Sequence, residues 1–396
     1  MATLSPGRTR IHRARLPRHC CACWRRRTKI MDFVMKHKRA FIVGAVVLIL
    51  LVAGGVWFMK NLPDTIVEVL FNSAISTNQT INNFEDDAFY VITTGTGAPL
   101  PDPGRAGPQA VVIAGDQVLV FDCGPGSTHK LELIMDASSV DALFLTHYHS
   151  DHIGDMGELM LKRWGTGGSA EPLPIYGPPG IEEVVAGFEA AYQLDKGYRV
   201  AHHGEEAMPP SGFGGEVHLF DLGTDLMTSQ VVYEQDDVQV IAFNVDHTPI
   251  FPAVGYRVTY KDRSVVITGD TVYTESLTHH SMGADVLISE ALNHEFSQMV
   301  AEASRDVDNN MSTVAEDIQD YHITPEQAGV VARDAGIPYL IITHVLPPVP
   351  SQILVNPFLR DARAVYDGEL YMANDGTMVK IPVDSEKITI VELLEK

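Results

Sequence analysis

The sequence predicts an α/β layered domain preceded by a single transmembrane helix. Three observations support this fold class. Residues 40–58 form an uncharged apolar run, and short β-rich runs alternate with helical patterns over the remainder of the 396 residues. The 32 glycines and 23 prolines are typical of many short elements joined by loops. Strands and helices mixed in this way pack as layers around a common core.

The apolar run is long enough to cross a membrane. At about 1.5 Å per residue, a helix of this length roughly spans a bilayer core of about 30 Å. Lys36, Lys38 and Arg39 precede the run and only Lys60 follows it, so we expect a cytoplasmic N-terminus and a periplasmic or extracytoplasmic body. A cleaved signal peptide is the alternative, but no A-x-A site follows closely. We therefore expect a signal anchor over residues 40–59 of a single-pass membrane protein.

The rest of the chain divides around this anchor. Residues 1–39 are expected to be a basic cytoplasmic leader without a fold, and Met31 is an alternative start. Residues 60–86 are expected to be a linker, and residues 87–396 a single large domain. Cys20, Cys21 and Cys23 lie in the leader, which leaves Cys123 alone in the body and excludes an internal disulfide there.

The body is strongly acidic. Residues 40–396 hold 17 basic and 50 acidic side chains, a formal charge of −33. Such a surface repels phosphate backbones at long range, so nucleic acid is not expected as a partner. The acidity is equally compatible with a role in solubility or a salty habitat.

Nine runs in the body have the composition of strands, and two have helical patterns. The strands are predicted at 88–94, 110–114, 117–122, 141–146, 239–245, 254–260, 264–268, 284–288 and 339–343. One helix is predicted at 181–194, after Pro178, Pro179 and Gly180. The other is predicted at 325–335, where Thr324, Pro325 and Gln327 form a capping box. Residues 197–215 and 302–321 are expected to be loops.

The strongest chemical signal is the string His147-Tyr148-His149-Ser150-Asp151-His152, which follows the apolar run DALFLT. It therefore lies where a strand ends, which is where ligands gather in α/β sheets. Histidines two residues apart on an extended loop can point at one ion, and the following Asp-His pair can turn to a second. Imidazole and carboxylate suit Zn²⁺ first, with Mn²⁺ or Fe²⁺ as alternatives.

Three later residues follow apolar runs in the same way. His247 follows VIAFNVD, Asp270 follows SVVITG, and His344 follows YLIIT. Together with the histidine string they complete seven candidate ligands for two divalent metal ions.

This arrangement resembles the metallo-β-lactamase superfamily from about residue 88 onward. The resemblance implies a four-layer αββα sandwich. It also implies that one metal is held by His147, His149 and His247 and the other by Asp151, His152 and His344, with Asp270 bridging. Asp122, in FDCG, matches the structural aspartate of the family beneath the site and would orient a ligand.

Within the superfamily the chain is similar to the branch that holds ribonuclease Z and the arylsulfatase/phosphodiesterase-type enzymes. Four stretches carry this similarity: 94–108 (TGTGAPLPDPGRAGP), 247–257 (HTPIFPAVGYR), 289–295 (SEALNHE) and 322–345. The resemblance implies that Glu290 pairs with His322, which assists the leaving group. Asp151, His322 and Glu290 are therefore the expected catalytic residues.

Two features depart from ribonuclease Z. The stretch at 195–215 has little positive charge where that enzyme carries a basic tRNA-gripping arm, and LPPVPS follows the last ligand in place of Ser-x-Arg. We therefore expect a membrane-anchored hydrolase in which metal-bound hydroxide attacks a small anionic ester, either a phosphodiester or an aryl sulfate. The alternatives are a ribonuclease Z-type tRNA 3′-processing endonuclease, a lactonase and a non-catalytic metal-binding scaffold. A homodimer is left open.

Overall fold

A computed structural model describes residues 38–78, 84, 88–307, 309–383, 385 and 387–394. The chain divides into two compact units, Met1–Ser76 and Thr77–Lys396. Most of the predicted leader, including Met31, and much of the predicted linker after residue 78 lie outside the described residues. The proposed domain boundaries at residues 39, 59 and 86 stay predictions.

The described part of the first unit forms α2 (Lys38–Lys60) and most of α3 (Asp64–Asn78). Within the described residues, no single helix meets the length and apolarity expected of a membrane span. The segments Val46–Lys60 and Asp64–Ser73 meet the criterion only as a pair, bent by 68°. The single membrane-spanning helix predicted from the sequence is therefore not found among these residues. The predicted run, residues 40–59, lies within α2, before the bend at 61–63.

Two sheets form the centre of the second unit. The first has eight strands in the order β15 (Thr389–Glu392), β14 (Thr377–Pro382), β1 (Ala88–Gly95), β2 (Gln109–Ala114), β3 (Gln117–Phe121), β4 (Ala142–Phe144), β5 (Leu173–Gly177) and β6 (Gly215–Leu219). The second has seven strands in the order β13 (Glu369–Met372), β12 (Tyr339–Leu346), β11 (Val286–Leu292), β10 (Arg263–Ile267), β9 (Val254–Tyr260), β8 (Val238–Asn244) and β7 (Ser229–Gln235).

The alternation of side chains along β1 shows how the layers arise. Phe89 and Val91 pack between the two sheets, whereas Tyr90 and Ile92 pack on the outer face of the first sheet. Successive side chains of a strand point to opposite faces, so a strand that is apolar at every position is buried on both. Both sheets therefore need a covering layer of helices.

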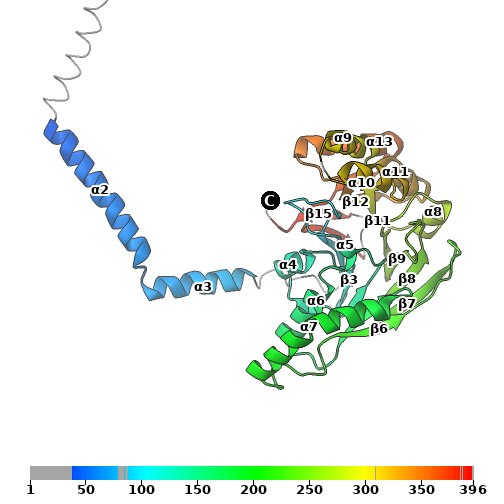
Figure 1. Cartoon of the computed structure of the whole chain (residues 1–396), viewed down its shortest axis with the longest axis horizontal. Coiled ribbons are helices and arrows are strands. Elements are labelled where there is room, and N and C mark those ends of the chain that lie inside the picture. The colour runs from blue at the N-terminus through cyan, green and yellow to red at the C-terminus, as the bar shows by residue number, and fades with distance from the viewer. Residues whose placement is uncertain are drawn as a thin grey trace, which may run out of the picture. The chain divides into compact units, whose positions relative to one another are not determined.

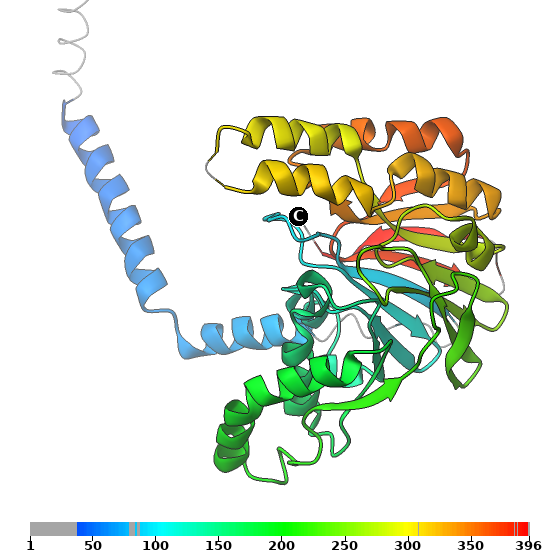
Figure 2. The same ribbon diagram turned by 45° about the vertical axis from the view of Figure 1, so that its right-hand side comes forward.

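Helices supply the two outer layers, as Figures 1 and 2 show. The first sheet is covered by α4 (Ser127–Glu132), α6 (Met156–Gly167) and α7 (Ile181–His203), and α5 (Ser150–Ile153) lies next to α6 in the chain. The second sheet carries α8 (Glu275–Ser281), α11 (Pro325–Asp334), α12 (Val355–Phe358) and α13 (Arg360–Val365), with α9 (His294–Ser304) and α10 (Met311–Asp317) beside them. Three 3₁₀ turns, at 137–139, 318–320 and 352–354, complete the unit. The α/β sandwich with two sheets is confirmed.

The nine predicted strands all exist, with ends shifted by a few residues, and the capping box of Thr324 and Gln327 is formed. Two loop predictions are wrong. The helix predicted at 181–194 continues to His203 as α7, and α10 occupies part of the stretch predicted as a loop at 302–321. In both places polar and charged residues lie on the solvent-exposed face of a helix, and this composition resembles that of a loop.

Candidate metal centre

The predicted ligands come together at one edge of the two sheets. His147 and His149 follow β4, and Asp151 and His152 lie on α5 directly afterwards. Three more candidates belong to the second sheet: His247 follows β8, Asp270 follows β10, and His344 lies within β12. Residues almost 200 positions apart in the chain are thus neighbours, because both sheets present this end of their strands to the same place.

One group consists of His147, His149, His247 and Asp270, whose ligand atoms all lie within 4.8 Å of one another. His147 Nε2 lies 3.0 Å from His149 Nδ1 and 3.8 Å from Asp270 Oδ2. His247 Nε2 is 3.9 Å from the same Asp270 oxygen. Three imidazoles and a carboxylate at these separations are a suitable donor set for one divalent cation.

A second group consists of Asp151, His152 and His344. His344 Nε2 lies 3.3 Å from Asp151 Oδ2 and 3.4 Å from Asp270 Oδ2, and His152 Nε2 lies 3.3 Å from Asp270 Oδ1. Asp270 therefore borders both groups, and it is 2 % exposed. A carboxylate in this position can bridge two ions, as the resemblance implied.

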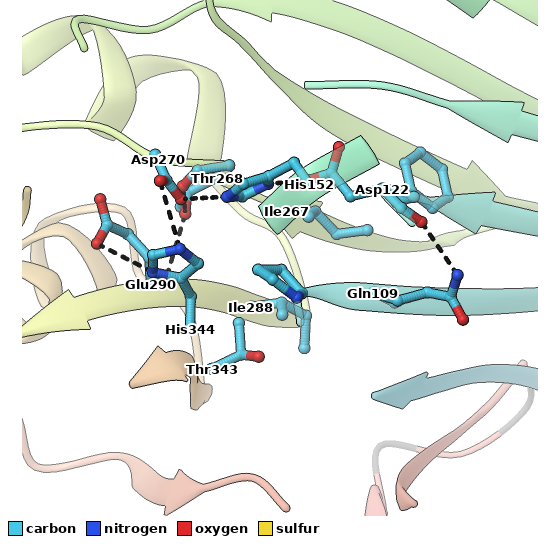
Figure 3. A pocket seen from close by; sticks show the side chains of 14 residues that line it. Gln109, Asp122, His152, Ile267, Thr268, Asp270, Ile288, Glu290, Thr343 and His344 are labelled. Carbon is cyan, nitrogen blue, oxygen red and sulfur yellow. Dashed lines mark hydrogen bonds and ion pairs between the residues drawn. The ribbon is translucent and has the colours of Figure 1, made fainter. Parts of the chain in front are cut away.

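The donor atoms at the centre fit a pair of cations. Among the described residues, His152 Nε2, His247 Nε2 and Asp270 Oδ1 are buried and have no hydrogen-bond partner. Buried polar atoms without a partner are costly and rare in folded proteins. Figure 3 shows the His152, Asp270 and His344 side chains directed toward one another. Metal ions would satisfy these atoms.

A carboxylate beneath the site fixes the orientation of His152. Asp122 Oδ2 accepts a hydrogen bond from His152 Nδ1 at 2.8 Å, and Asp122 Oδ1 accepts one from the Thr146 amide at 2.8 Å. His247 is held in the same way, since its Nδ1 donates to the Tyr321 carbonyl oxygen at 2.9 Å. In both histidines the hydrogen bond leaves Nε2 as the free donor to a metal.

The backbone has an unusual conformation at two residues of the site. Asp122 and His344 have φ values of 58° and 43°, which non-glycine residues seldom adopt. His344 is also the extra residue of a bulge in β12, because Glu290 pairs with Thr343 whereas Ala291 pairs with Val345. Such a bulge redirects a side chain out of the regular alternation, and here it places His344 at the centre.

Gly269 allows a close approach of two segments beside Asp270. Its φ is 60°, and a Cβ atom there would lie 2.9 Å from both Thr146 Cβ and the Val254 carbonyl oxygen. Only glycine fits this position without displacing its neighbours.

Burial and neighbouring charges set the protonation of the candidate ligands. Burial lowers the pKa of His247 to about 4 and holds the pKa of His147 well below its usual value, with further lowering by adjacent histidines. Burial alone would raise the pKa of Asp270, but the charges of His152 and His344 outweigh it and hold this pKa well below its usual range. Burial opposes the charged forms of His152 and His344, but Asp270 and the neighbouring carboxylates outweigh it and raise the pKa of both histidines. Because neutral imidazoles and an ionised carboxylate are the forms that bind metal, metal binding would release protons from these two rings.

Glu290 and His322 form a pair next to this centre. His322 Nδ1 donates to Glu290, at 2.8 Å from Oε2 and 2.9 Å from Oε1. Glu290 Oε1 also accepts a hydrogen bond from the Thr271 amide at 2.8 Å. Glu290, His322, Asp270 and His344 lie close enough to form a further potential ligand group. However, both Glu290 oxygens already have partners, which favours an orienting role for Glu290.

Together, the fold and site define a class of protein: an α/β sandwich whose sheet edge carries a centre of histidines and aspartates suited to two cations. Residues 117–345 match the family described as "Beta-lactamase superfamily domain", which is more than half of the chain. The chain therefore belongs to the metallo-β-lactamase superfamily, whose members are metal-dependent hydrolases.

Curated relatives of the chain include ribonucleases Z. The chain is 36% identical over 260 residues to Ribonuclease Z of Mycobacterium avium (strain 104), covering 65% of this chain and 86% of the relative. It is 34% identical over 291 residues to Ribonuclease Z of Mycobacterium bovis (strain BCG / Pasteur 1173P2), covering 72% and 96%. The short form of human tRNase Z shares the fold at a TM-score of 0.53 and 24% identity, covering 74% of this chain and 100% of that chain.

These relatives contradict the partners expected from the sequence. Ribonuclease Z and tRNase Z act on a nucleic acid, so the expectation of a small anionic ester, with nucleic acid an improbable partner, was wrong. That expectation rested on the net charge, on the low positive charge of 195–215, on LPPVPS after the last ligand and on the predicted anchor. The net charge sums over the whole surface and does not describe the site. A local centre holding two cations can attract a phosphate even within an acidic body.

Proposed function

We propose that this protein is a ribonuclease Z-type endonuclease that hydrolyses a phosphodiester bond at the 3′ side of tRNA precursors. The observation that carries the proposal is the similarity over 86–96% of the length of curated ribonucleases Z. The buried ligand set and the Glu290–His322 pair support it, because every side chain that the chemistry needs lies at one sheet edge.

The proposed metal ligands follow from the two groups described above. His147, His149 and His247 would hold one divalent ion and Asp151, His152 and His344 the other, and Asp270 would belong to both groups. Zinc suits this nitrogen and oxygen set, and manganese or iron are the alternatives. When bound, the two ions supply an acidified water and positive charge that stabilises the phosphoryl oxygens in the transition state.

The remaining steps belong to side chains of the chain itself. Asp151 lines the groove that reaches the centre, and we assign to it the acceptance of the proton of the attacking water. Because His322 Nδ1 is held by Glu290, its Nε2 is the ring atom left to give a proton to the leaving oxygen. The ring that gives this proton is the doubly protonated imidazolium, and Glu290 holds its orientation and stabilises its charge.

Direct cleavage assays test the proposed substrate. Purified full-length protein, loaded with zinc or manganese, is incubated with a tRNA precursor carrying a 3′ trailer, and aryl sulfate and lactone substrates serve as controls. We expect endonucleolytic release of the trailer at one position. An enzyme that turns over a control substrate and leaves the precursor intact would contradict the proposal.

The location of the domain is a separate proposal that rests on the sequence alone. Lys36, Lys38 and Arg39 before the apolar run favour a cytoplasmic N-terminus and a domain on the far side of the membrane. A domain there would not meet cytoplasmic tRNA, so the two proposals exclude each other. A compartment-sensitive reporter fused after the last residue decides between them: a cytoplasmic signal overturns the proposed location, and an extracytoplasmic signal overturns the tRNA substrate.

A further inference from the structure

An exposed aromatic side chain follows one of the proposed ligands. Phe251 is 61 % exposed and lies four residues after His247. In the described part of the domain, only two aromatic side chains are exposed by more than a third, and the other is Tyr198 on α7. Because Ile250, the residue before Phe251, pairs with the backbone of His247, the exposed ring follows the loop of a proposed ligand and is free to contact a bound molecule.

The loop that carries Phe251 is well ordered by its own hydrogen bonds. Asp246 Oδ1 accepts from the amide and the hydroxyl of Thr248, at 3.1 and 2.7 Å, and the Ile250 amide donates to the His247 carbonyl oxygen at 2.8 Å. The Asp246 carbonyl oxygen accepts from the Val272 amide at 2.8 Å, which ties the loop to the segment after Asp270. The Phe251 ring is therefore exposed on a loop that hydrogen bonds hold in place.

A second aromatic ring touches the site directly. The ring centroid of Tyr321 lies 5.2 Å from that of His247 and 4.8 Å from that of His322, and the Tyr321 side chain is half-buried. The Tyr321 ring thus contacts His247, and the Phe251 ring is exposed on the loop that follows His247.

The cationic side chains near the centre, Arg105 and Lys130, already have partners within the protein. Arg105 is the one Arg or Lys that lines the groove of about 700 Å³ reaching Asp151, and it already donates to Thr96 Oγ1 and the Ala373 carbonyl oxygen, both at 2.6 Å. Nearby, Lys130 lies 3.5 Å from Asp375 Oδ2. Contacts to the phosphate backbone from cationic side chains are therefore scarce here, in contrast to most nucleic-acid sites.

We propose that Phe251, with Tyr321, is the stacking surface for an unpaired base next to the scissile phosphate of the RNA substrate. This inference rests on the proposed function and adds the way in which the site holds its substrate. Every base has a π-face, so stacking on aromatic rings tolerates sequence variation and does not depend on positive charge. An enzyme with an acidic body can bind single-stranded RNA in this way.

The test compares two substrates and three variants. The substrates are a tRNA precursor with a 3′ trailer and the same RNA with abasic nucleotides on both sides of the cleavage position. The variants of the full-length, metal-loaded protein are Phe251→Ala, Phe251→Trp and the control Met282→Ala, which removes an apolar side chain that is 56 % exposed at the end of α8.

We expect Phe251→Ala to raise KM for the base-containing RNA about 5- to 100-fold, in line with the loss of one stacked base, with kcat little changed. Phe251→Trp should retain the KM of the unaltered protein, and Met282→Ala should not change it. On the abasic RNA, Phe251→Ala and the unaltered protein should be equal, because the base that the ring would hold is absent.

Two results would overturn the inference. One is an unchanged KM of Phe251→Ala on the base-containing RNA, and the other is an equal loss on both RNAs, which indicates a structural role. Both leave the proposed function intact, because the unaltered protein cleaves RNA in each. An unaltered protein that cleaves neither RNA contradicts the proposed function, and the inference falls with it.

Discussion

At the scale of single residues, a substitution of His322 tests proton transfer separately from metal binding. Its contact with Glu290 and its absence from the two main ligand groups predict that His322→Ala keeps its metal. Turnover should fall about 10²- to 10⁴-fold, the usual contribution of a general acid, and most for substrates with poor leaving groups. Metal content by mass spectrometry and single-turnover rates check this, with Glu290→Gln as the partner variant. Unchanged turnover would remove His322 from the mechanism.

Asp122 acts on the centre through His152. It is 5 % exposed and accepts from His152 Nδ1 and from the amide and hydroxyl of Thr146. Asp122→Asn leaves a side chain of the same size but replaces an acceptor oxygen by an amino group, so the orientation of His152 weakens. We expect metal affinity to fall about 10- to 100-fold, measured by competition with a chelator. An affinity equal to that of the unaltered protein would mean that Asp122 supports only the fold.

Some residues of the site could be predicted from the sequence, and others could not. His147, His149, Asp151 and His152 fall within six positions, so the pattern that identifies them is local. The role of Tyr321 was missed, because it depends on a backbone carbonyl oxygen that reaches His247 and a ring that contacts His322. Such contacts join distant segments and leave no periodic signal.

At the scale of elements, the close approach at Gly269 gives a test of packing between the two sheets. Gly269→Ala places a Cβ 2.9 Å from Thr146 Cβ and the Val254 carbonyl oxygen at a φ of 60°. We expect a loss of roughly 1–3 kcal/mol in the free energy of unfolding, together with weaker metal binding.

The matched control is Gly187→Ala in the middle of α7, where a Cβ meets nothing within 4 Å. It should stabilise the protein by about 0.5–1 kcal/mol, because alanine favours a helix over glycine. Urea unfolding of both metal-free variants gives the comparison. Equal effects of the two substitutions would show that the approach at Gly269 is not tight.

Some elements could be predicted and others could not. Strands such as β3 and β12 contain continuous apolar runs, at 118–121 and 339–342, and such runs identify buried strands directly. The bulge at His344 is set by pairing with Glu290 on β11, and β14 pairs with β1 from almost 300 residues away. Register and pairing of this kind depend on tertiary contacts that a single sequence does not display.

At the scale of the whole molecule, net charge proved a poor guide to the substrate. The formal charge of −33 over residues 40–396 led to the exclusion of nucleic acid, which the relatives contradict. Long-range charge influences encounter rates, whereas the reaction depends on local groups at the centre. The fold class was predicted more reliably, since the layers follow from apolar patterns that extend over the whole domain.

The central claim is that seven side chains at one sheet edge bind two metal ions on which hydrolysis of the substrate depends. The most direct measurement is the metal content of the purified protein, determined together with cleavage of a tRNA precursor before and after chelation. We predict about two ions per chain, loss of cleavage when they are removed, recovery when zinc or manganese is restored, and loss of metal in Asp270→Ala. A protein without stoichiometric metal, or one that cleaves equally well after complete chelation, would contradict the claim.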